Sequence, residues 1–134
     1  MKLYHFAAAH MLDGIRAEGL TRGCIPRFGS EGKSVAMRLG WQWLTTNPAW
    51  EQSWNTCVMV PYSRTAYRIE VCIPKSARAR LNRWLGICDE YGPWTVDILN
   101  VGYTPEEWFV FDGRIPPAWF RSVERNPNKS EGAA

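Results

Sequence analysis

The stretch "EEWFVFDGRIPPAWFRSVE", residues 106–124, decides the fold that the sequence predicts. It contains two bulky apolar runs, 107–111 and 119–124, whose aromatic and β-branched residues are typical of strands. The dipeptide Asp112–Gly113 between them is a common turn of β-hairpins. The two prolines that follow cannot donate to a strand ladder, so they belong at an edge or just before a strand. The pattern predicts a β-hairpin formed by the two runs.

Two adjacent carboxylates, Glu106 and Glu107, stand at the mouth of the predicted hairpin. Neighbouring residues of a strand face opposite sides, so the two side chains should point in different directions. A glutamate that opens a strand is most often a solvated edge residue. Glu107 is therefore either such a residue or a group with a chemical role. Glu106 takes its place if the register slips by one residue.

The rest of the chain alternates between strand and helix patterns. Alternation with a period of two predicts strands at 2–7, 41–46 and 65–74, with a possible short strand at 35–38. Apolar residues at helical spacing after the first strand predict a helix, and Gly19 is suited to end it.

Residues that commonly cap helices predict two more, at 48–55 behind Asn47 and from Ser76 onward. The segment 87–104 fits either a helix or a strand. Together these elements predict a small α+β domain with a mostly antiparallel, split sheet and a few short helices. We expect one domain over residues 1–125 and a disordered polar tail at 126–134.

The composition limits the class of protein. The 134 residues fit one domain, the net charge is only +3, and eight tryptophans predict either a bulky core or flat stacking surfaces. The four cysteines form no CxxC pair and there are two histidines, so no metal site is expected. Neither a signal peptide nor an apolar run of membrane-spanning length is found, so we expect a cytoplasmic protein without a membrane partner.

Three segments, taken in chain order, carry a resemblance to a known family. They are Tyr4-His5 with Ile15 and Gly19-Leu20, the strand "WQWLT" at 41–45, and Glu107 with Gly113, Ile115-Pro116-Pro117, Phe120 and Val123. In this order they resemble the ADP-ribosyltransferase fold, in its branches of DarT-type toxins and RNA 2′-phosphotransferases. The resemblance covers residues 2–124, which is nearly the whole chain.

The resemblance implies a compact ADP-ribosyltransferase-like domain with NAD as co-substrate and no metal. Cleavage of the nicotinamide–ribose bond passes through an oxocarbenium-like state, which a carboxylate beside the ribose stabilises. The resemblance assigns this role to Glu107, with Glu106 as the alternative.

The resemblance also implies NAD contacts from its first two motifs. Tyr4 and His5 would contact NAD from the first strand, and Trp43 with Thr45 would line the nicotinamide pocket. Arg64 and Arg68 flank the start of a strand, and one of them could bind the diphosphate through its planar guanidinium. Arg68 is the one that we place among the expected contacts.

The chain departs from the family pattern at its second motif. That motif usually carries Tyr, Ser-Thr or His, whereas Trp43 has no phenolic hydroxyl. The phosphotransferase branch has a second histidine there, but the second histidine of this chain, His10, falls on the predicted helix. These departures argue against tRNA 2′-phosphotransfer.

Two functional hypotheses follow. The first is an NAD-dependent mono-ADP-ribosyltransferase, or NAD glycohydrolase, that modifies a nucleic acid or a protein; analogy implies a toxin-like role in conflict between bacteria and phages. The second is a non-catalytic binding or inhibitor protein with the same fold, which grips a nucleic acid or a host defence complex. The basic run "KSARARLNR", residues 75–83, is then either a solvated helix face or a phosphate-binding surface.

Overall fold

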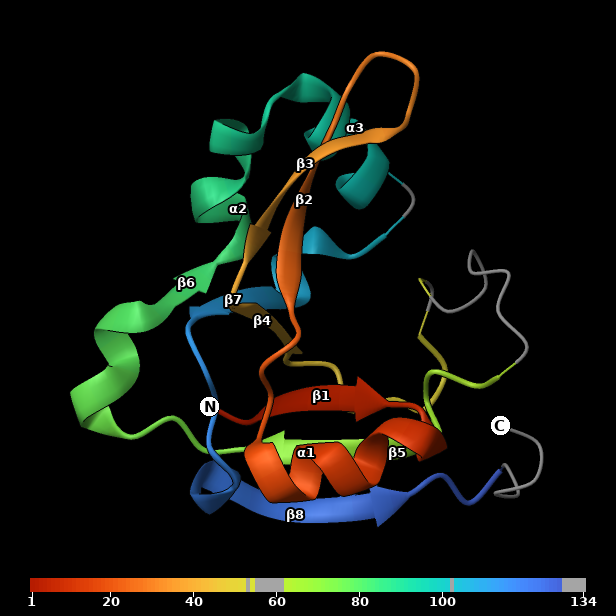
Figure 1. The fold of residues 1–134 in the computed structure, drawn as a ribbon, viewed down its shortest axis with the longest axis vertical. Coiled ribbons are helices and arrows are strands. Elements are labelled where there is room, and N and C mark those ends of the chain that lie inside the picture. Colours follow the sequence, from red (N-terminus) through yellow and green to blue (C-terminus); the bar gives the residue numbers. More distant parts are fainter. Residues whose placement is uncertain (53, 55–61, 102, 129–134) are drawn as a thin grey trace.

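The computed structural model describes residues 1–52, 54, 62–101 and 103–128, and their strands form two antiparallel sheets. One sheet has six strands in the order β6-β7-β4-β1-β5-β8, while β2 and β3 form a two-stranded ribbon (Figure 1). The predicted α+β class and mostly antiparallel sheet are thus confirmed. The strands are β1 (Leu3–Ala7), β2 (Cys24–Phe28), β3 (Ser34–Leu39), β4 (Trp41–Thr45), β5 (Tyr67–Val71), β6 (Leu81–Arg83), β7 (Trp108–Asp112) and β8 (Phe120–Arg125).

The helices of the described chain are short. The α-helices are α1 (Leu12–Glu18), α2 (Trp84–Ile87) and α3 (Pro93–Asn100). The 3₁₀ helices are η1 (Ala9–Met11), η3 (Lys75–Arg80), η4 (Cys88–Tyr91), η5 (Pro105–Glu107) and η6 (Pro117–Trp119). The helix predicted before Gly19 is present, and Gly19 ends it with a φ of 84°, a conformation that favours glycine.

The predicted hairpin is wrong, although both of its strands exist. β7 pairs with β4 on one side and β6 on the other, whereas β8 pairs with β5. Three strands therefore separate β7 from β8 in the sheet order. The segment that joins them is a crossover between two distant parts of the sheet.

The crossover is held by contacts that the turn pattern did not reveal. Leu20 and Ile115 form an isolated antiparallel bridge, with the N–H of Leu20 donating to the carbonyl of Ile115 at 2.9 Å. The N–H of Cys72 donates to the carbonyl of Trp119 at 2.8 Å. These bonds hold the segment around the two prolines against the residues that follow α1 and β5, so the chain does not fold back after Gly113.

Two predicted helices are also wrong in part. Residues 48–52 are not helical: the Asn47 side chain accepts from the N–H of Ala49 at 2.9 Å, which forms a local turn instead of starting a helix. Residues 53 and 55 lie outside the described part of the chain. The helix from Ser76 is interrupted, because Leu81–Arg83 become an edge strand that pairs with β7. The uncertain segment 87–104 contains the helix α3.

Ordered structure continues beyond the expected end of the domain at residue 125. Asn126 is buried, its N–H donates to the carbonyl of Ala66 at 2.8 Å, and its side-chain amide donates to the carbonyl of Thr65 at 3.0 Å. The expected tail lies partly outside the described residues, from 129 onward.

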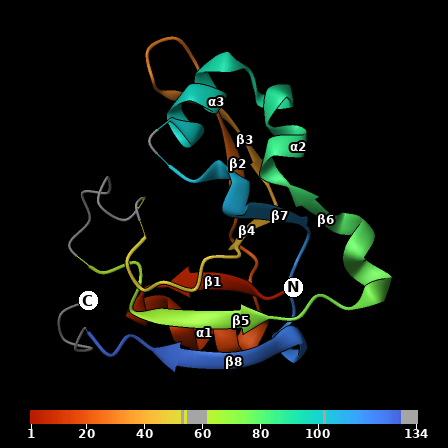
Figure 2. The ribbon, with the colours of Figure 1, turned by 180° about the vertical axis from the view of Figure 1, so that it is seen from behind.

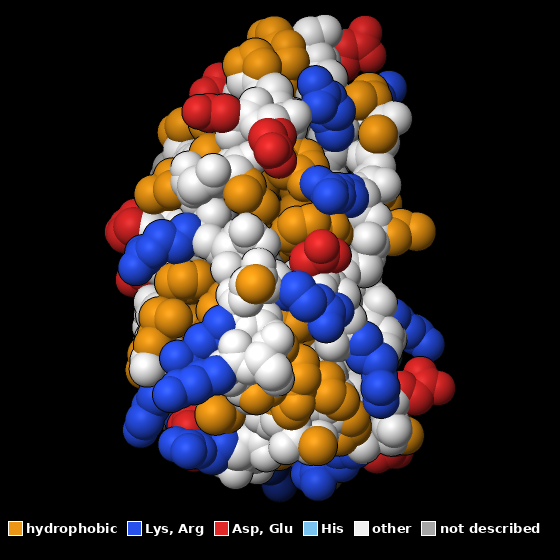
Figure 3. All heavy atoms as spheres, turned by 90° about the vertical axis from the view of Figure 1, so that its left-hand side faces the viewer, with side chains coloured by type: hydrophobic (Ala, Val, Ile, Leu, Met, Phe, Trp, Pro, Cys, Tyr) orange, Lys and Arg blue, Asp and Glu red, His pale blue; other side chains and the backbone are white. Residues whose placement is uncertain are grey.

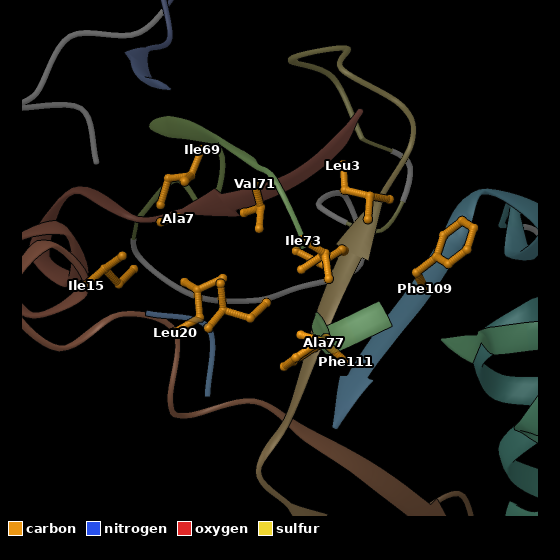
Figure 4. Close-up of a cluster of buried hydrophobic side chains, with 12 residues drawn as sticks. Leu3, Ala7, Ile15, Leu20, Ile69, Val71, Ile73, Ala77, Phe109 and Phe111 are labelled. Carbon is orange, nitrogen blue, oxygen red and sulfur yellow. The ribbon is translucent and has the colours of Figure 1, made fainter. Parts of the chain in front are cut away.

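Two apolar clusters support the two halves of the sheet. In the lower half of Figure 1, α1 packs beside β1, β5 and β8, and Figure 2 shows the same layer from behind. Ile15 and Leu20 approach Ile69 and Val71 there, and Phe109 and Phe111 continue the cluster toward β7 (Figure 4). In the upper half, α2, η4 and the β2–β3 ribbon enclose a second cluster that contains Ile25, Trp41, Trp84, Cys88, Tyr91 and Val110.

The sheet is split between β1 and β4. These strands share a single register pair, Tyr4 with Thr45, whereas β1 pairs with β5 along its full length from Leu3 to Ala7. β4 likewise pairs with β7 along its full length. The β1–β4 junction is therefore the weakest seam of the sheet, and the candidate site lies around it.

Candidate active site

The Glu107 carboxylate is held by two neighbouring side chains. The hydroxyl of Thr104 donates to Oε2 at 2.7 Å, and the amide Nδ2 of Asn47 donates to the same oxygen at 3.2 Å. No hydrogen bond from the part of the chain that the structure describes reaches Oε1. Two described side chains thus anchor one oxygen of the carboxylate in a set position.

The backbone of Glu107 is tied to the end of β4. The N–H of Thr46 donates to the carbonyl of Glu107 at 3.0 Å, just before β7 begins. Glu106 is exposed and Glu107 is partly buried, so the two acids lie in different surroundings. Glu107 is the acid that the surrounding residues position.

His5 lies at the split between β1 and β4. Its ring Nδ1 is 3.0 Å from the carbonyl oxygen of Trp43. Because a carbonyl only accepts, Nδ1 carries the proton, and Nε2 of the neutral ring is an acceptor. Burial lowers the pKa of His5 below its ordinary value of 6.5, the hydrogen bond to Trp43 opposes this, and the positive charge of Arg64 adds to it. The ring is therefore neutral at physiological pH.

Trp43 and Thr45 support the site from within the fold. The ring of Trp43 lies 4.9 Å from that of Trp84 and 5.9 Å from that of Trp108, and its N–H donates to the carbonyl of Cys24 at 2.8 Å. Thr45 is fully buried, and its hydroxyl accepts from the N–H of Asn47 at 3.1 Å. Trp43 thus positions Trp108, and Thr45 positions the residue that binds Glu107.

A second group of aromatic and basic side chains adjoins these residues. The rings of Trp54 and Trp108 are 6.3 Å apart, and the Arg64 guanidinium lies 4.7 Å from the centre of the Trp54 ring. Arg64 is partly buried, and burial lowers its pKa. No carboxylate of a described residue pairs with it. Arg64 therefore places a positive charge near His5, and no described residue offers it a carboxylate partner.

Arg68, by contrast, is already engaged by the fold. Its guanidinium lies over the rings of Tyr4 and Trp50, at 5.5 and 4.5 Å, and pairs with Glu124 at 3.2 Å. It also donates to the carbonyl of Pro48. Tyr4 is buried beneath it. The contacts of Arg68 hold the segment after β4 against the sheet, and Arg64 is the better placed of the two arginines to bind a diphosphate.

The strand register relates Glu107 to His5. Thr45 pairs with Tyr4 on one side and with Trp108 on the other, so these three residues form one row across β1, β4 and β7. Glu107 precedes Trp108 and His5 follows Tyr4. Because β1 and β7 run parallel, the two residues are displaced from this row in opposite directions, and with strands about 4.8 Å apart their backbones are roughly 12 Å from each other. Both belong to the same region of the sheet.

Thr104, Asn47 and Arg64 complete the site, and sequence reasoning did not assign the first two to it. A signal for Thr104 exists: Thr104-Pro-Glu-Glu107 has the S/T-x-x-E spacing of a capping box, which brings the first and fourth side chains together. The sequence predicts Asn47 as a helix cap, and its Oδ1 does accept from the N–H of Ala49. The bond from its Nδ2 to a residue sixty positions away has no local signal.

In comparisons with known proteins, no family model, no curated protein and no solved structure matches the chain. Among the described residues, none of the helices has the length and apolar character needed to cross a membrane.

Proposed function

We propose that the protein is an NAD-dependent mono-ADP-ribosyltransferase or NAD glycohydrolase that uses Glu107 as its catalytic carboxylate. The observation that carries the proposal is the one-sided anchoring of this group, with Oε2 bonded to Thr104 and Asn47 and Oε1 without a hydrogen bond from the described residues. A carboxylate fixed in this way presents one oxygen in a set orientation. Such preorganisation is what stabilises positive charge that develops on a ribose.

The residues around Glu107 fit NAD in part. The neutral His5 ring offers Nε2 as an acceptor for a ribose hydroxyl, and Arg64 offers a cation without a carboxylate partner among the described residues for a diphosphate. Trp54 and Trp108 offer aromatic surface beside that cation. NAD, when bound, would supply the activated nicotinamide–ribose bond. Arg68, Trp43 and Thr45 act in this proposal as supports for the binding residues.

The acceptor in this proposal is a macromolecule, nucleic acid or protein, or water. We place the reaction in the cytoplasm, where the free thiols of Cys24, Cys72 and Cys88 would stay reduced. Conflict between bacteria and phages is the setting that analogy with toxin-like members of the resembled family supports.

The proposal is tested by incubating the purified protein with NAD carrying a labelled adenosine moiety and a bacterial lysate. The measurements are release of nicotinamide and the macromolecular fraction that becomes labelled. Glu107→Gln should lose at least about a hundredfold in the rate of nicotinamide release, because it removes the charge that stabilises the transition state. Glu106→Gln is the matched control, since this neighbouring acid is exposed, and it should keep the wild-type rate.

Circular dichroism of both variants shows whether the fold is intact. The enzyme hypothesis fails if the wild-type protein releases no nicotinamide and shows no NAD binding by calorimetry. It also fails in its assignment of Glu107 if both glutamine variants keep the wild-type rate.

A second candidate function, a binding protein for nucleic acid, is favoured by the basic face around η3 and β6. Arg80 and Arg83 are exposed, and their guanidinium groups lie over the rings of Phe111 and Phe109 at 4.8 and 5.0 Å. Figure 3 shows Lys and Arg side chains over much of this face, next to exposed apolar side chains. Ordered arginines near a free surface suit phosphate contacts better than mobile ones do.

This candidate predicts binding to single- or double-stranded nucleic acid that weakens as salt concentration rises. In the double variant Arg80→Gln with Arg83→Gln, the slope of log K against log[salt] should become less negative by about two, because two cations no longer contact phosphates. Arg16→Gln with Arg22→Gln, two exposed arginines in or near the helix α1, is the matched control. Equal salt dependence in both double variants would exclude this face as the binding surface.

A further inference from the structure

Four strands of the described chain end a sheet, and three of their outer edges are protected. β6 is only three residues long, and β8 carries the charged side chains of Arg121, Glu124 and Arg125. The outer edge of β2 is covered, because the N–H of Phe28 donates to Thr95 and the carbonyl of Cys24 accepts from Trp43. Short length, charge and coverage are the usual means of keeping edge strands from pairing.

β3 is neither short nor covered, and it carries little charge. All six of its residues are exposed, and β2 is the strand that it pairs with. Val35, Met37 and Leu39 are 67, 59 and 75% exposed and lie on one face of the strand, and adjoining exposed apolar side chains of this kind often mark an interaction surface. Arg38 is the single charged residue between Ser34 and Leu39.

The register of the ribbon shows which backbone groups β3 turns outward. The N–H of Gly40 donates to the carbonyl of Gly23, so hydrogen-bonded pairs alternate from that point and include Ile25 with Arg38. Pro26, which has no N–H, accordingly falls opposite Met37 in a pair that is not hydrogen-bonded. The backbone groups of Met37 and Leu39 therefore point away from β2. Among the described residues, no hydrogen bond reaches these groups.

A second copy of the same strand fits this edge. In an antiparallel pair with the twofold axis at Met37, each Met37 faces its equivalent, and Leu39 faces Val35 of the second copy. Arg38 then faces the small Ala36 of the second copy. Moving the axis to Arg38 would instead place two residues of like charge directly opposite each other, which is unfavourable. Charge and apolar pattern thus select the axis at Met37.

We propose that the protein forms a twofold dimer through the outer edge of β3, with the axis at Met37. The two ribbons join into one four-stranded sheet, β2-β3-β3-β2, whose central strands exchange the backbone hydrogen bonds of Met37 and Leu39. In a twofold contact of this kind each molecule uses the same surface, so the contact forms a closed dimer and cannot continue into a filament. The pairing covers the three exposed apolar side chains in part. This inference is independent of the proposed enzymatic activity.

The dimer is tested by sedimentation velocity over a dilution series of the full chain from near millimolar to low micromolar concentration. The wild-type protein should shift from dimer to monomer within this range, because strand pairing of this length buries little area. Met37→Glu, which puts two carboxylates on the axis, should be monomeric throughout. Val101→Glu, on a side chain that is 72% exposed after α3, is the control and should behave as the wild type does.

Two variants of Ala36 test the register. Ala36→Glu sets a carboxylate opposite Arg38 of the second copy and should tighten the dimer roughly threefold or more, since two such pairs form per dimer. Ala36→Lys, of similar length and opposite charge, should weaken it to a similar extent. Circular dichroism verifies that each variant keeps its fold.

Three results would overturn the proposal. A wild-type protein that is monomeric over the whole range has no such dimer. A Met37→Glu variant that stays dimeric places the interface elsewhere. Equal dissociation constants for Ala36→Glu and Ala36→Lys exclude the twofold axis at Met37.

Discussion

The hydroxyl of Thr104 lies 2.7 Å from Oε2 of Glu107, three residues further along the chain. The N–H of Glu107 also donates to the carbonyl of Thr104 at 3.0 Å, so the turn η5 is closed by both backbone and side chains. This local turn fixes the orientation of the carboxylate before β7 begins. The position of the acid therefore depends on a residue that does not need to contact a substrate.

Replacing Thr104 should reduce catalysis without reducing stability by much. In Thr104→Val, the charge-assisted hydrogen bond is lost and Oε2 is held by Asn47 alone, so kcat for nicotinamide release should fall about tenfold or more. KM should change little, because Thr104 positions another residue. Thr104→Ser retains the hydroxyl and should restore most of the rate. A valine variant with the wild-type kcat would show that the anchoring has no catalytic role.

His5 should make stability depend on pH. Its folded-state pKa is lowered from the ordinary 6.5, mainly by burial, so the unfolded chain binds more protons as pH falls below about 6.5. The contribution of the neutral ring is fully present above that pH and is lost as pH drops through the folded pKa. The slope is at most about 1.4 kcal/mol per pH unit. Urea unfolding at about ten pH values between roughly pH 5 and 8 measures the free energy of unfolding and hence this slope.

The chain supplies a matched control for this pH effect. His5→Asn should remove the slope, whereas His10→Gln, at the exposed second histidine, should keep it. If the slope persists in His5→Asn, His5 is not the group that causes it.

The two arginines should separate binding from stability. Arg64→Gln should weaken NAD binding about tenfold in calorimetry and lower the unfolding free energy by less than Arg68→Gln does, because Arg64 contacts the Trp54 ring but pairs with no carboxylate among the described residues. Arg68→Gln should instead cost about 1–2 kcal/mol of stability, because it removes the contacts with Glu124 and the Tyr4 and Trp50 rings. If Arg68→Gln weakens NAD binding and Arg64→Gln does not, Arg68 is the residue that contacts the diphosphate.

Gly19 should be sensitive to substitution, and Gly14 should not. A Cβ at Gly19 would lie 2.2 Å from the carbonyl oxygen of Ile115, in a backbone with a φ of 84°. Gly19→Ala should thus destabilise the protein by at least about 1–2 kcal/mol. Gly14 lies in the same helix, and a Cβ added there would have no atom within 4 Å, so Gly14→Ala should stabilise by about 0.5–1 kcal/mol. Thermal unfolding of both variants compares the two glycines directly.

Local patterns in the sequence identified several strands and the end of one helix. The alternation at 2–7, 41–46 and 65–74 corresponds to β1, β4 and β5, and the stop at Gly19 is where α1 ends. These features depend on residues that are close together in the chain. The alternation of their side chains and their backbone preferences can be read from a short stretch of sequence.

Pairing between distant segments was not visible in this way. The run after Glu107 has the composition of a hairpin, but β7 is paired by β4 and β6, and the bonds from Leu20 and Cys72 hold the crossover. Pairing with either of two strands that have similar apolar faces stabilises a strand by a similar amount. Which strand becomes its neighbour therefore depends on the packing of the whole fold. The same reason explains Asn47, whose bond to Glu107 joins residues sixty positions apart.

The split between β1 and β4 has a consequence for how the chain must fold. The half with β1, β5 and β8 and the half with β4, β6 and β7 are each assembled from separate pieces of sequence, because the chain alternates between them. Neither half is a continuous segment, so the seam is no domain boundary, and a fragment that ends before β8 lacks an edge strand of the first half. Most of the native pairing must therefore form together, which favours slow, highly cooperative folding over assembly from independent parts.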